Sequence, residues 1–178
     1  MGKKTGISVG KRVMIMGSAG SGKSTLATKL GEITGIPVTH LDRMFWNPGW
    51  VQTPSYEMDS NVTKVAAGDS WIIDGNYLRT LSVRLQRADT IIFLDFNRYI
   101  CLYRVIKRCI KNYGKTRYDL GEGCPEKMDW PFIKWVWGYP KHSRKAILEA
   151  INESGKTFVN LKSRKDVAKY IKMVRLNE

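Results

Sequence analysis

Short apolar runs alternate along the chain with longer segments in which apolar residues recur at helical spacing. The runs are nearly continuous rather than alternating, which is typical of strands buried on both faces of a parallel sheet. They predict strands at 11–16, 37–42, 70–74, 90–95 and 157–161. The remaining segments predict helices at 23–34, from near Pro54, at 78–87, at 98–112, at 141–153, and from Ser163, whose spacing to Asp166 resembles a capping box.

Strands that alternate with helices predict an α/β fold, a five-stranded parallel sheet with helices on both faces. At 178 residues the chain is long enough for a proper core, and no linker or repeat divides it, so we expect a single domain over 1–178. Two stretches, 43–53 and 113–140, carry no regular pattern. The second is expected to be an irregular lid segment. Its glycine and proline breaks are Gly114, Gly121, Gly123, Pro125 and Pro131.

A glycine-rich loop lies between the first predicted strand and the first predicted helix. Its residues are Gly17, Ser18, Ala19, Gly20, Ser21, Gly22, Lys23, Ser24 and Thr25. The glycines let backbone N–H groups surround a phosphate, and the helix N-terminus adds unpaired donors and a positive dipole end. In this pattern Lys23 reaches the β- and γ-phosphates of a nucleotide, and the Ser24 hydroxyl holds Mg²⁺. We therefore expect this phosphate loop (17–25) to bind ATP with Mg²⁺.

Aspartates follow other predicted strands, at the edge where ligands bind in parallel sheets. Asp42 could accept a proton from an acceptor hydroxyl or hold a Mg²⁺-bound water, or it could serve only as a turn or cap residue. Asp74 is the candidate for the second Mg²⁺-holding group because Gly75 leaves space beside the phosphate loop, and Asp95 is its alternative. Neither Asp74 nor Asp95 is followed by Glu, and the guanine-reading Asn-Lys-x-Asp is missing. Transfer to an acceptor is therefore favoured over a motor ATPase or a GTPase switch.

Aromatic and polar residues follow two of these strands. Trp46 and Trp50 lie in the loop after Asp42, where they pack either on a ring-bearing substrate or on the protein's own core. Asn76 and Arg79 come shortly after the third strand. We expect Asp42, Trp46, Asn76 and Arg79 to contact the phosphoryl acceptor.

The chain is strongly basic, with a formal net charge of +14. Residues 96–118 contain seven Lys or Arg and no acidic residue. Arg104 and Arg108 are spaced to point at one place before the lid, and we expect them to stabilise the transferring phosphoryl group. Arg117 and Arg144 are further candidates. The same charge could instead be a solvated helix face, or could bind nucleic acid without sequence preference.

Cysteine content and hydropathy point to a compartment. Cys101, Cys109 and Cys124 are an odd number with no C-x-x-C spacing, which predicts reduced thiols rather than a disulfide frame or a zinc site. No apolar run approaches the roughly 18 residues of a membrane span, and residues 1–6 lack the apolar core of a secretion signal. We therefore expect a cytoplasmic protein with no membrane contact, and its oligomeric state is left open.

The order of these motifs resembles that of the adenylate-kinase-like P-loop kinases. It consists of the phosphate loop, Asp42, the turn Asp74-Gly75-Asn76-Tyr77, and Leu102-Tyr103-Arg104-Val105-Ile106-Lys107-Arg108 before a lid. More narrowly, 41–50, 71–77 and 117–126 resemble the bacterial DNA topology modulation proteins. The resemblance covers about 11–171 and implies an adenylate-kinase-like fold with ATP and Mg²⁺, without defining the acceptor.

The chain departs from adenylate kinases at two points. Where those carry Asp-Gly-Phe-Pro-Arg, residues 74–79 read Asp-Gly-Asn-Tyr-Leu-Arg, so AMP is not assumed as the acceptor. Some relatives hold zinc in the lid with four ligands, which Cys124 alone does not provide.

Two functions are compatible with these motifs. The first is a small-molecule kinase in which Lys23, Asp42, Arg104 and Arg108 are catalytic. The second is an ATP-binding, DNA-associated regulatory protein without small-molecule kinase activity, as the relatives' name and the basic charge suggest. Against the second, the sequence shows no helix-turn-helix signature, RNA-binding aromatic motif or zinc finger.

Overall fold

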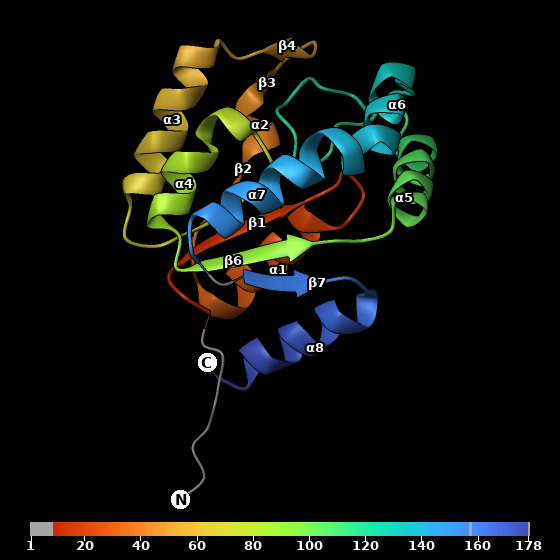
Figure 1. Cartoon of the computed structure of the whole chain (residues 1–178). Helices are drawn as coiled ribbons and strands as arrows, with labels where there is room; N and C mark the ends of the chain where they lie inside the picture. Colours follow the sequence, from red (N-terminus) through yellow and green to blue (C-terminus); the bar gives the residue numbers. More distant parts are fainter. Residues whose placement is uncertain (1–8, 157, 178) are drawn as a thin grey trace, which may run out of the picture.

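The computed structural model describes residues 9–156 and 158–177, in which a five-stranded parallel sheet carries helices on both faces (Figure 1). The strands lie in the order β2-β5-β1-β6-β7. Their bounds are β1 Arg12–Gly17, β2 Val38–His40, β5 Trp71–Asp74, β6 Thr90–Leu94 and β7 Phe158–Leu161. The predicted fold class is therefore confirmed. The predicted start of the last strand at 157 and the N-terminal residues 1–6 lie outside the described residues, and the single domain stays a prediction.

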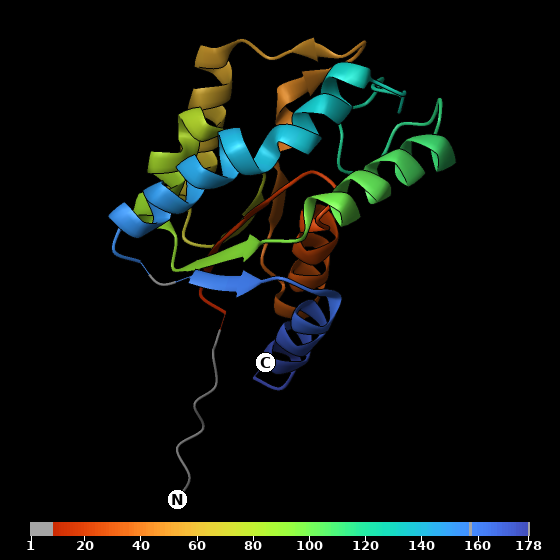
Figure 2. The same ribbon diagram turned by 45° about the vertical axis from the view of Figure 1, so that its right-hand side comes forward.

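Helices cover both faces of the sheet (Figures 1 and 2). On one face lie α1 Lys23–Thr34 and α8 Arg164–Arg175, and on the other lie α3 Ser55–Ala67, α4 Leu81–Arg87 and α7 Lys145–Glu153. Successive strand residues point to opposite faces: Val13 and Ile15 pack with α1 and α8, whereas Met14 and Met16 pack with the other layer. Strands buried on both sides explain why the apolar runs in the sequence are continuous.

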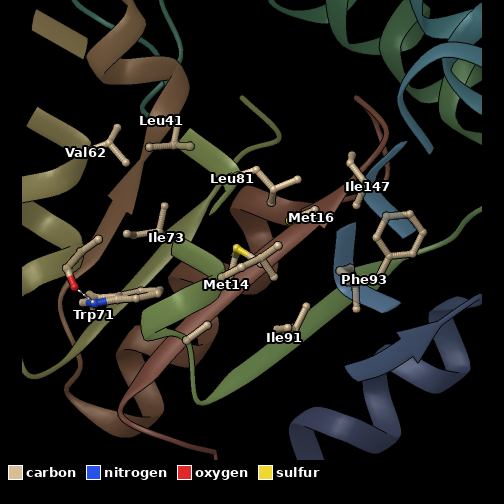
Figure 3. Close-up of a cluster of buried hydrophobic side chains, with 14 of the residues drawn as sticks. Met14, Met16, Leu41, Val62, Trp71, Ile73, Leu81, Ile91, Phe93 and Ile147 are labelled. Carbon is tan, nitrogen blue, oxygen red and sulfur yellow. Dashed lines mark hydrogen bonds between the residues drawn. The ribbon is translucent and has the colours of Figure 1, made fainter. Parts of the chain in front are cut away.

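The larger core cluster lies between the sheet and α3, α4 and α7 (Figure 3). Met14 and Phe93 project from the sheet into this cluster, and Val62 of α3 joins it on the side of Leu41 and Ile73. The Trp71 indole is almost fully buried, and its N–H donates to the Ala66 carbonyl over 3.2 Å. Each large apolar side chain buried in this way stabilises the fold by about 1.5–3 kcal/mol.

Two further helices, α5 Arg98–Lys111 and α6 Trp130–Tyr139, pack against each other with a small apolar cluster of their own. α5 follows β6 directly and lies over the phosphate loop. A Cβ atom at Gly20 would overlap the carbonyl oxygen of Cys101 on α5, so the helix approaches the loop backbone closely. Cys101, Cys109 and Cys124 are all buried free thiols. Within the part of the chain that the structure describes, no helix combines the length and apolarity that crossing a bilayer requires.

The stretch 43–53, predicted to be irregular, contains short elements. Strand β2 ends at His40, two residues before the predicted end, and the chain turns at once into the helix α2 Leu41–Phe45. A hairpin follows, with strands β3 Trp46–Asn47 and β4 Val51–Gln52. Its turn places Gly49 and Trp50 at positive φ, 78° and 65°.

The lid segment 113–140 is only partly irregular, because it contains α6. The Asp129 side chain accepts a hydrogen bond from the Phe132 N–H over 3.4 Å, and Pro131 lies in the first turn. Both are helix-start signals. The prediction had taken Pro131 for a break and had not used Asp129. The loop before α6 forms isolated bridges between Tyr113 and Glu126 and between Thr116 and Pro125.

Two predicted helices begin with a turn that is not α-helical. The segment predicted as a helix at 78–87 starts as the 3₁₀ turn η1 Leu78–Thr80, and α4 follows it. The segment predicted at 141–153 starts as a π-helical turn, η2 Pro140–Arg144, before α7.

Candidate functional site

The phosphate loop connects the end of β1 to the first turn of α1. Gly17, Gly20 and Gly22 have positive φ of 146°, 76° and 101°, conformations that residues with a side chain rarely adopt. The Ser21 N–H donates to the Ser18 carbonyl over 3.1 Å, and the Lys23 ammonium donates to the same carbonyl over 3.0 Å. Burial lowers the pKa of Lys23, and the negative charges of Asp42 and Asp74 oppose that shift.

Asn76 holds the loop at its first residue. The Gly17 N–H donates to Asn76 Oδ1 over 3.1 Å, and Asn76 Nδ2 donates to the Gly17 carbonyl over 2.9 Å. Because one amide satisfies both backbone groups of Gly17, this side chain shapes the phosphate loop. The predicted contact of Asn76 with the acceptor stays a prediction, and Asn76 does line the cavity of the site.

Asp74 connects the loop to the second strand of the chain. Its Oδ2 accepts a hydrogen bond from the Ser24 hydroxyl over 2.8 Å, and its Oδ1 lies 2.5 Å from His40 Nδ1. Burial alone would lower the pKa of His40, but the hydrogen bond and charge of Asp74 outweigh it and raise that pKa. A hydroxyl and a carboxylate oxygen in contact form a donor set of the kind that Mg²⁺ takes. The residues therefore fit the predicted metal site.

The alternative carboxylate, Asp95, has a different partner. Arg144 holds both of its oxygens, with Nε and Nη2 each 2.8 Å away. The hydrogen bond from Arg144 lowers the pKa of Asp95. This ion pair joins the end of β6 to η2, and it engages Arg144 as well, a further candidate for the phosphoryl group.

Asp42 lies in the first turn of α2. Its Oδ1 accepts a hydrogen bond from the Tyr77 hydroxyl over 3.1 Å. Burial raises the pKa of Asp42, with a contribution from the charge of Asp74, while the Lys23 ammonium opposes the shift. A carboxylate whose pKa is raised is a stronger base, which suits it to accept the proton of a hydroxyl.

The two arginines of α5 have different partners. Arg104 Nη1 lies 3.3 Å from the carbonyl oxygens of Gly20 and Ser21, on the backbone of the phosphate loop. Arg108 Nε lies 3.1 Å from Glu126 Oε2, in the lid. Both line the same cavity, but α5 sends one guanidinium to the loop and the other to the lid.

The lid contains a buried cluster of charges. Glu126 is 5% exposed, and its Oε2 lies 3.1 Å from Nε of both Arg108 and Arg117. Asp119 lies 3.5 Å from Arg117. Sequence reasoning singled out the two arginines and missed both carboxylates. The two arginines and the two carboxylates balance in charge, so this cluster between α5 and the lid has no formal net charge.

One large cavity, of about 1640 Å³, connects these groups. Lys23, Ser24, Asp42, Trp46, Arg79 and Arg108 line it together with residues of the lid. The sequence-predicted residues of the phosphate loop, α2 and the lid entrance therefore meet in one place. Arg79 sits at an exposed position, where Asp59 of α3 pairs with it over 2.7 Å.

Comparisons with known proteins bear on the fold. No family model matches the chain, and no curated protein is similar to it in sequence. Two crystal structures superpose on nearly the whole chain. The chain has the P-loop kinase fold. Shikimate kinase from Aquifex aeolicus vf5 has a TM-score of 0.55 at 16% identity, over 93% of this chain and 94% of that one.

The second structure is a gluconokinase from Sinorhizobium meliloti 1021. Its TM-score is 0.51 at 12% identity, over 95% of this chain and 91% of that one. At such identities the likeness concerns the fold alone. The chemistry must therefore be argued from the residues in the cavity.

Proposed function

We propose that the protein is an ATP- and Mg²⁺-dependent kinase that transfers the γ-phosphoryl group to a hydroxyl of a small molecule or nucleotide. The observation that carries the proposal is the contact between the Ser24 hydroxyl and the buried Asp74 carboxylate, where Ser24 lines the same cavity as Lys23 and Asp42. These are the parts that phosphoryl transfer requires: a phosphate cradle, a metal site, and a proton acceptor opposite them. The names of the two structural neighbours, both kinases, support the same reaction class.

Each residue has a distinct role in this proposal. The phosphate loop (17–25) and Lys23 hold the β- and γ-phosphates, while Ser24 and Asp74 would hold Mg²⁺, which neutralises charge on the phosphates when bound. Asp42 accepts the proton of the acceptor hydroxyl. Arg108, from the lid side, stabilises the charge that develops on the transferring group. Arg104, against the loop backbone, positions the nucleotide.

Replacing Lys23 tests this function. We expect Lys23→Ala to lower ATP turnover with an acceptor about 10²–10³-fold, the usual effect of removing one stabilising donor. Calorimetry with Mg²⁺ and ATP measures binding, and ADP release in a broad acceptor panel measures transfer. Lys165→Ala, on the exposed first turn of α8, is the control. A Lys23→Ala protein with parental turnover would contradict the assignment.

A second candidate function rests on the outer surface of α5 and α6, which we call the basic aromatic face. Its members are Arg98, Tyr99, Tyr103, Lys107, Lys111 and Trp137. The Arg98 guanidinium lies 4.3 Å from the Trp137 ring centroid, and Lys107 lies 5.8 Å from that of Tyr103, which is 63% exposed. Exposed rings beside cations are typical of single-strand nucleic-acid binding. The resemblance to DNA topology modulation proteins likewise stays a proposal.

Salt dependence tests the basic aromatic face. We expect a labelled single-stranded oligonucleotide to bind with an affinity that falls steeply with salt, and Lys107→Ala to reduce the log–log slope by about 1. Fluorescence anisotropy at several salt concentrations measures this slope. Lys64→Ala on the exposed side of α3 is the control. Equal loss in both variants would mean that net charge alone, and no particular face, binds the strand.

A further inference from the structure

The acceptor end of the cavity is lined by aromatic rings. We use this term for the lining residues of α2, of the β3–β4 hairpin and of the turn at 75–79. The Phe45 ring centroid lies 4.8 Å from those of both Trp46 and Tyr77, and Trp46 lies 5.4 Å from Trp50. The interplanar angles are 81°, 49° and 72°, so the rings form a continuous aromatic wall whose faces point in different directions, and its Tyr77 hydroxyl donates to Asp42.

Full charges are few at this end. Among the described lining residues of α2, the hairpin and the turn, Asp42 and Arg79 are the charged ones, and the exposed Lys127 of the lid lies 5.7 Å from the Trp50 ring centroid. Arg79 is 69% exposed at its side chain and is already paired with Asp59, outside the cavity lining. The other lining cations belong to the phosphate loop, to α1, to α5, to the lid and to α8. They are Lys23, Lys29, Arg104, Arg108, Lys115, Arg117, Lys127 and Arg164.

This distribution of charge predicts an anionic substrate, ATP, at the phosphate loop and an uncharged acceptor at the acceptor end. The nucleotide's triphosphate requires cations, and most of the lining cations belong to the phosphate loop, α5 and the lid. An acceptor that carried a carboxylate or phosphate beside Asp42 would meet a like charge. The cations whose charge reaches Asp42 are Lys23, which the triphosphate engages in the proposed complex, and Arg117, which Glu126 already pairs, so neither is free to compensate the lost hydration of a second anion. A neutral hydroxyl compound has no such penalty. A flat ring or sugar face can also stack on the wall.

We propose, resting on the kinase function above, that the phosphoryl acceptor is an uncharged hydroxyl compound whose ring lies on the wall formed by Phe45, Trp46 and Tyr77. Two sources supply this chemistry, a nucleoside through its base and a neutral sugar through its apolar face. The acceptor is thus distinct from the nucleoside monophosphate that an adenylate kinase takes.

The transfer step is balanced with the groups present. The acceptor hydroxyl oxygen forms a bond to the γ-phosphorus while the bond from that phosphorus to the β–γ bridging oxygen breaks. The hydroxyl proton passes to the Asp42 carboxylate, and ADP leaves with the bridging oxygen. The product is the phosphomonoester of the neutral acceptor.

Matched acceptor pairs test the proposal. Nucleosides are compared with their 5′-monophosphates, and hexoses with the corresponding sugar acids, by ADP release with the full-length protein, Mg²⁺ and ATP. We expect a neutral member to have a kcat/KM at least tenfold above its anionic counterpart. The pair that supports ADP release identifies the acceptor as a nucleoside or as a sugar. An anionic member preferred over its neutral counterpart overturns the proposal and leaves the kinase function standing, whereas no turnover of any member overturns both.

Variants of Trp46 test the aromatic wall, while the matched acceptor pairs test the charge. Trp46→Leu is expected to raise KM for the neutral acceptor about tenfold, the order of one lost ring stack, with ATP affinity unchanged. Trp130→Leu is the control, because Trp130 on α6 is 72% exposed. If Trp46→Leu folds poorly, Trp46→Phe takes its place and should raise the KM less, because an aromatic ring remains. An unchanged KM in Trp46→Leu, or an equal rise in KM in Trp130→Leu, overturns the proposal.

Discussion

At the scale of single residues, Asp74 and Asp42 have different hydrogen-bond partners, which suit them to different chemical roles. Asp74 is held by Ser24 and His40, so both of its oxygens have fixed directions. Asp42 has one neutral partner, the Tyr77 hydroxyl, and burial raises its pKa. A fixed carboxylate suits a metal, whereas one with a raised pKa suits proton transfer.

The proposed role of Asp42 predicts a particular pH profile. The raised pKa means that Asp42 stays protonated to a higher pH than the usual value near ~3.9, so kcat/KM should rise with pH until the carboxylate is ionised. Asp42→Asn is expected to lower kcat about 10²–10⁴-fold and to remove this acid limb. ADP release between pH 4 and 8 measures it, with exposed Asp69→Asn as the control. An acid limb that persists in Asp42→Asn would assign it to another group.

The sequence predicted the role of functional residues where these are neighbours in the chain. The nine residues of the phosphate loop are contiguous, and their setting between a strand and a helix was apparent from the pattern. The importance of His40 was not, because it depends on the register of β2 against β5, which places His40 opposite Asp74. Its position at the end of a predicted strand was the available signal.

At the scale of elements, α5 and the lid complete the site. α5 lies on the phosphate loop at Gly20 and connects through Arg108 to Glu126 in the lid. The amphipathic pattern of α5 predicted the helix well. The partners of its arginines were not predictable, since helical spacing says which residues share a face and nothing about what meets that face. For the same reason Glu126 was missed.

Gly20→Ala probes the contact between α5 and the loop. A side chain at φ 76° is strained, and its Cβ would overlap the Cys101 carbonyl, so we expect a loss of stability of more than about 1 kcal/mol and weaker ATP binding. Gly114→Ala is a close control because its φ is 73° with open space around it. Urea unfolding and calorimetry measure the two effects. Equal losses in both variants would show that backbone strain, rather than helix contact, is responsible.

At the scale of the whole molecule, ion pairs join elements that are distant in sequence. Arg12 at the start of β1 pairs with Asp89 just before β6, over 2.7 Å, and Asp95 after β6 pairs with Arg144 of η2. Hydrogen bonds from these arginines lower the pKa of Asp89 and of Asp95. They therefore connect both ends of a central strand to the neighbouring structure.

These pairs predict acid destabilisation. A carboxylate with a lowered pKa in the folded chain contributes stability that is complete above its unfolded pKa near ~3.9 and is lost as pH falls through the folded pKa. Asp95→Asn should therefore lose less unfolding free energy between pH 6 and pH 3 than the parent protein. Urea unfolding at both pH values measures the difference, and exposed Glu153→Gln is the control. An identical acid loss in Asp95→Asn would exclude this pair as a contributor.

The sequence by itself determined the alternation of strands and helices, the parallel sheet and the phosphate loop, because each depends on neighbouring residues and short periodicities. Only the tertiary structure decided which side chains meet. Asn76 reaches Gly17 across 59 positions, and Asp74 reaches His40 across 34. Such pairs depend on strand order, register and the turns at strand ends, which pack segments far apart in the chain and which no local pattern encodes.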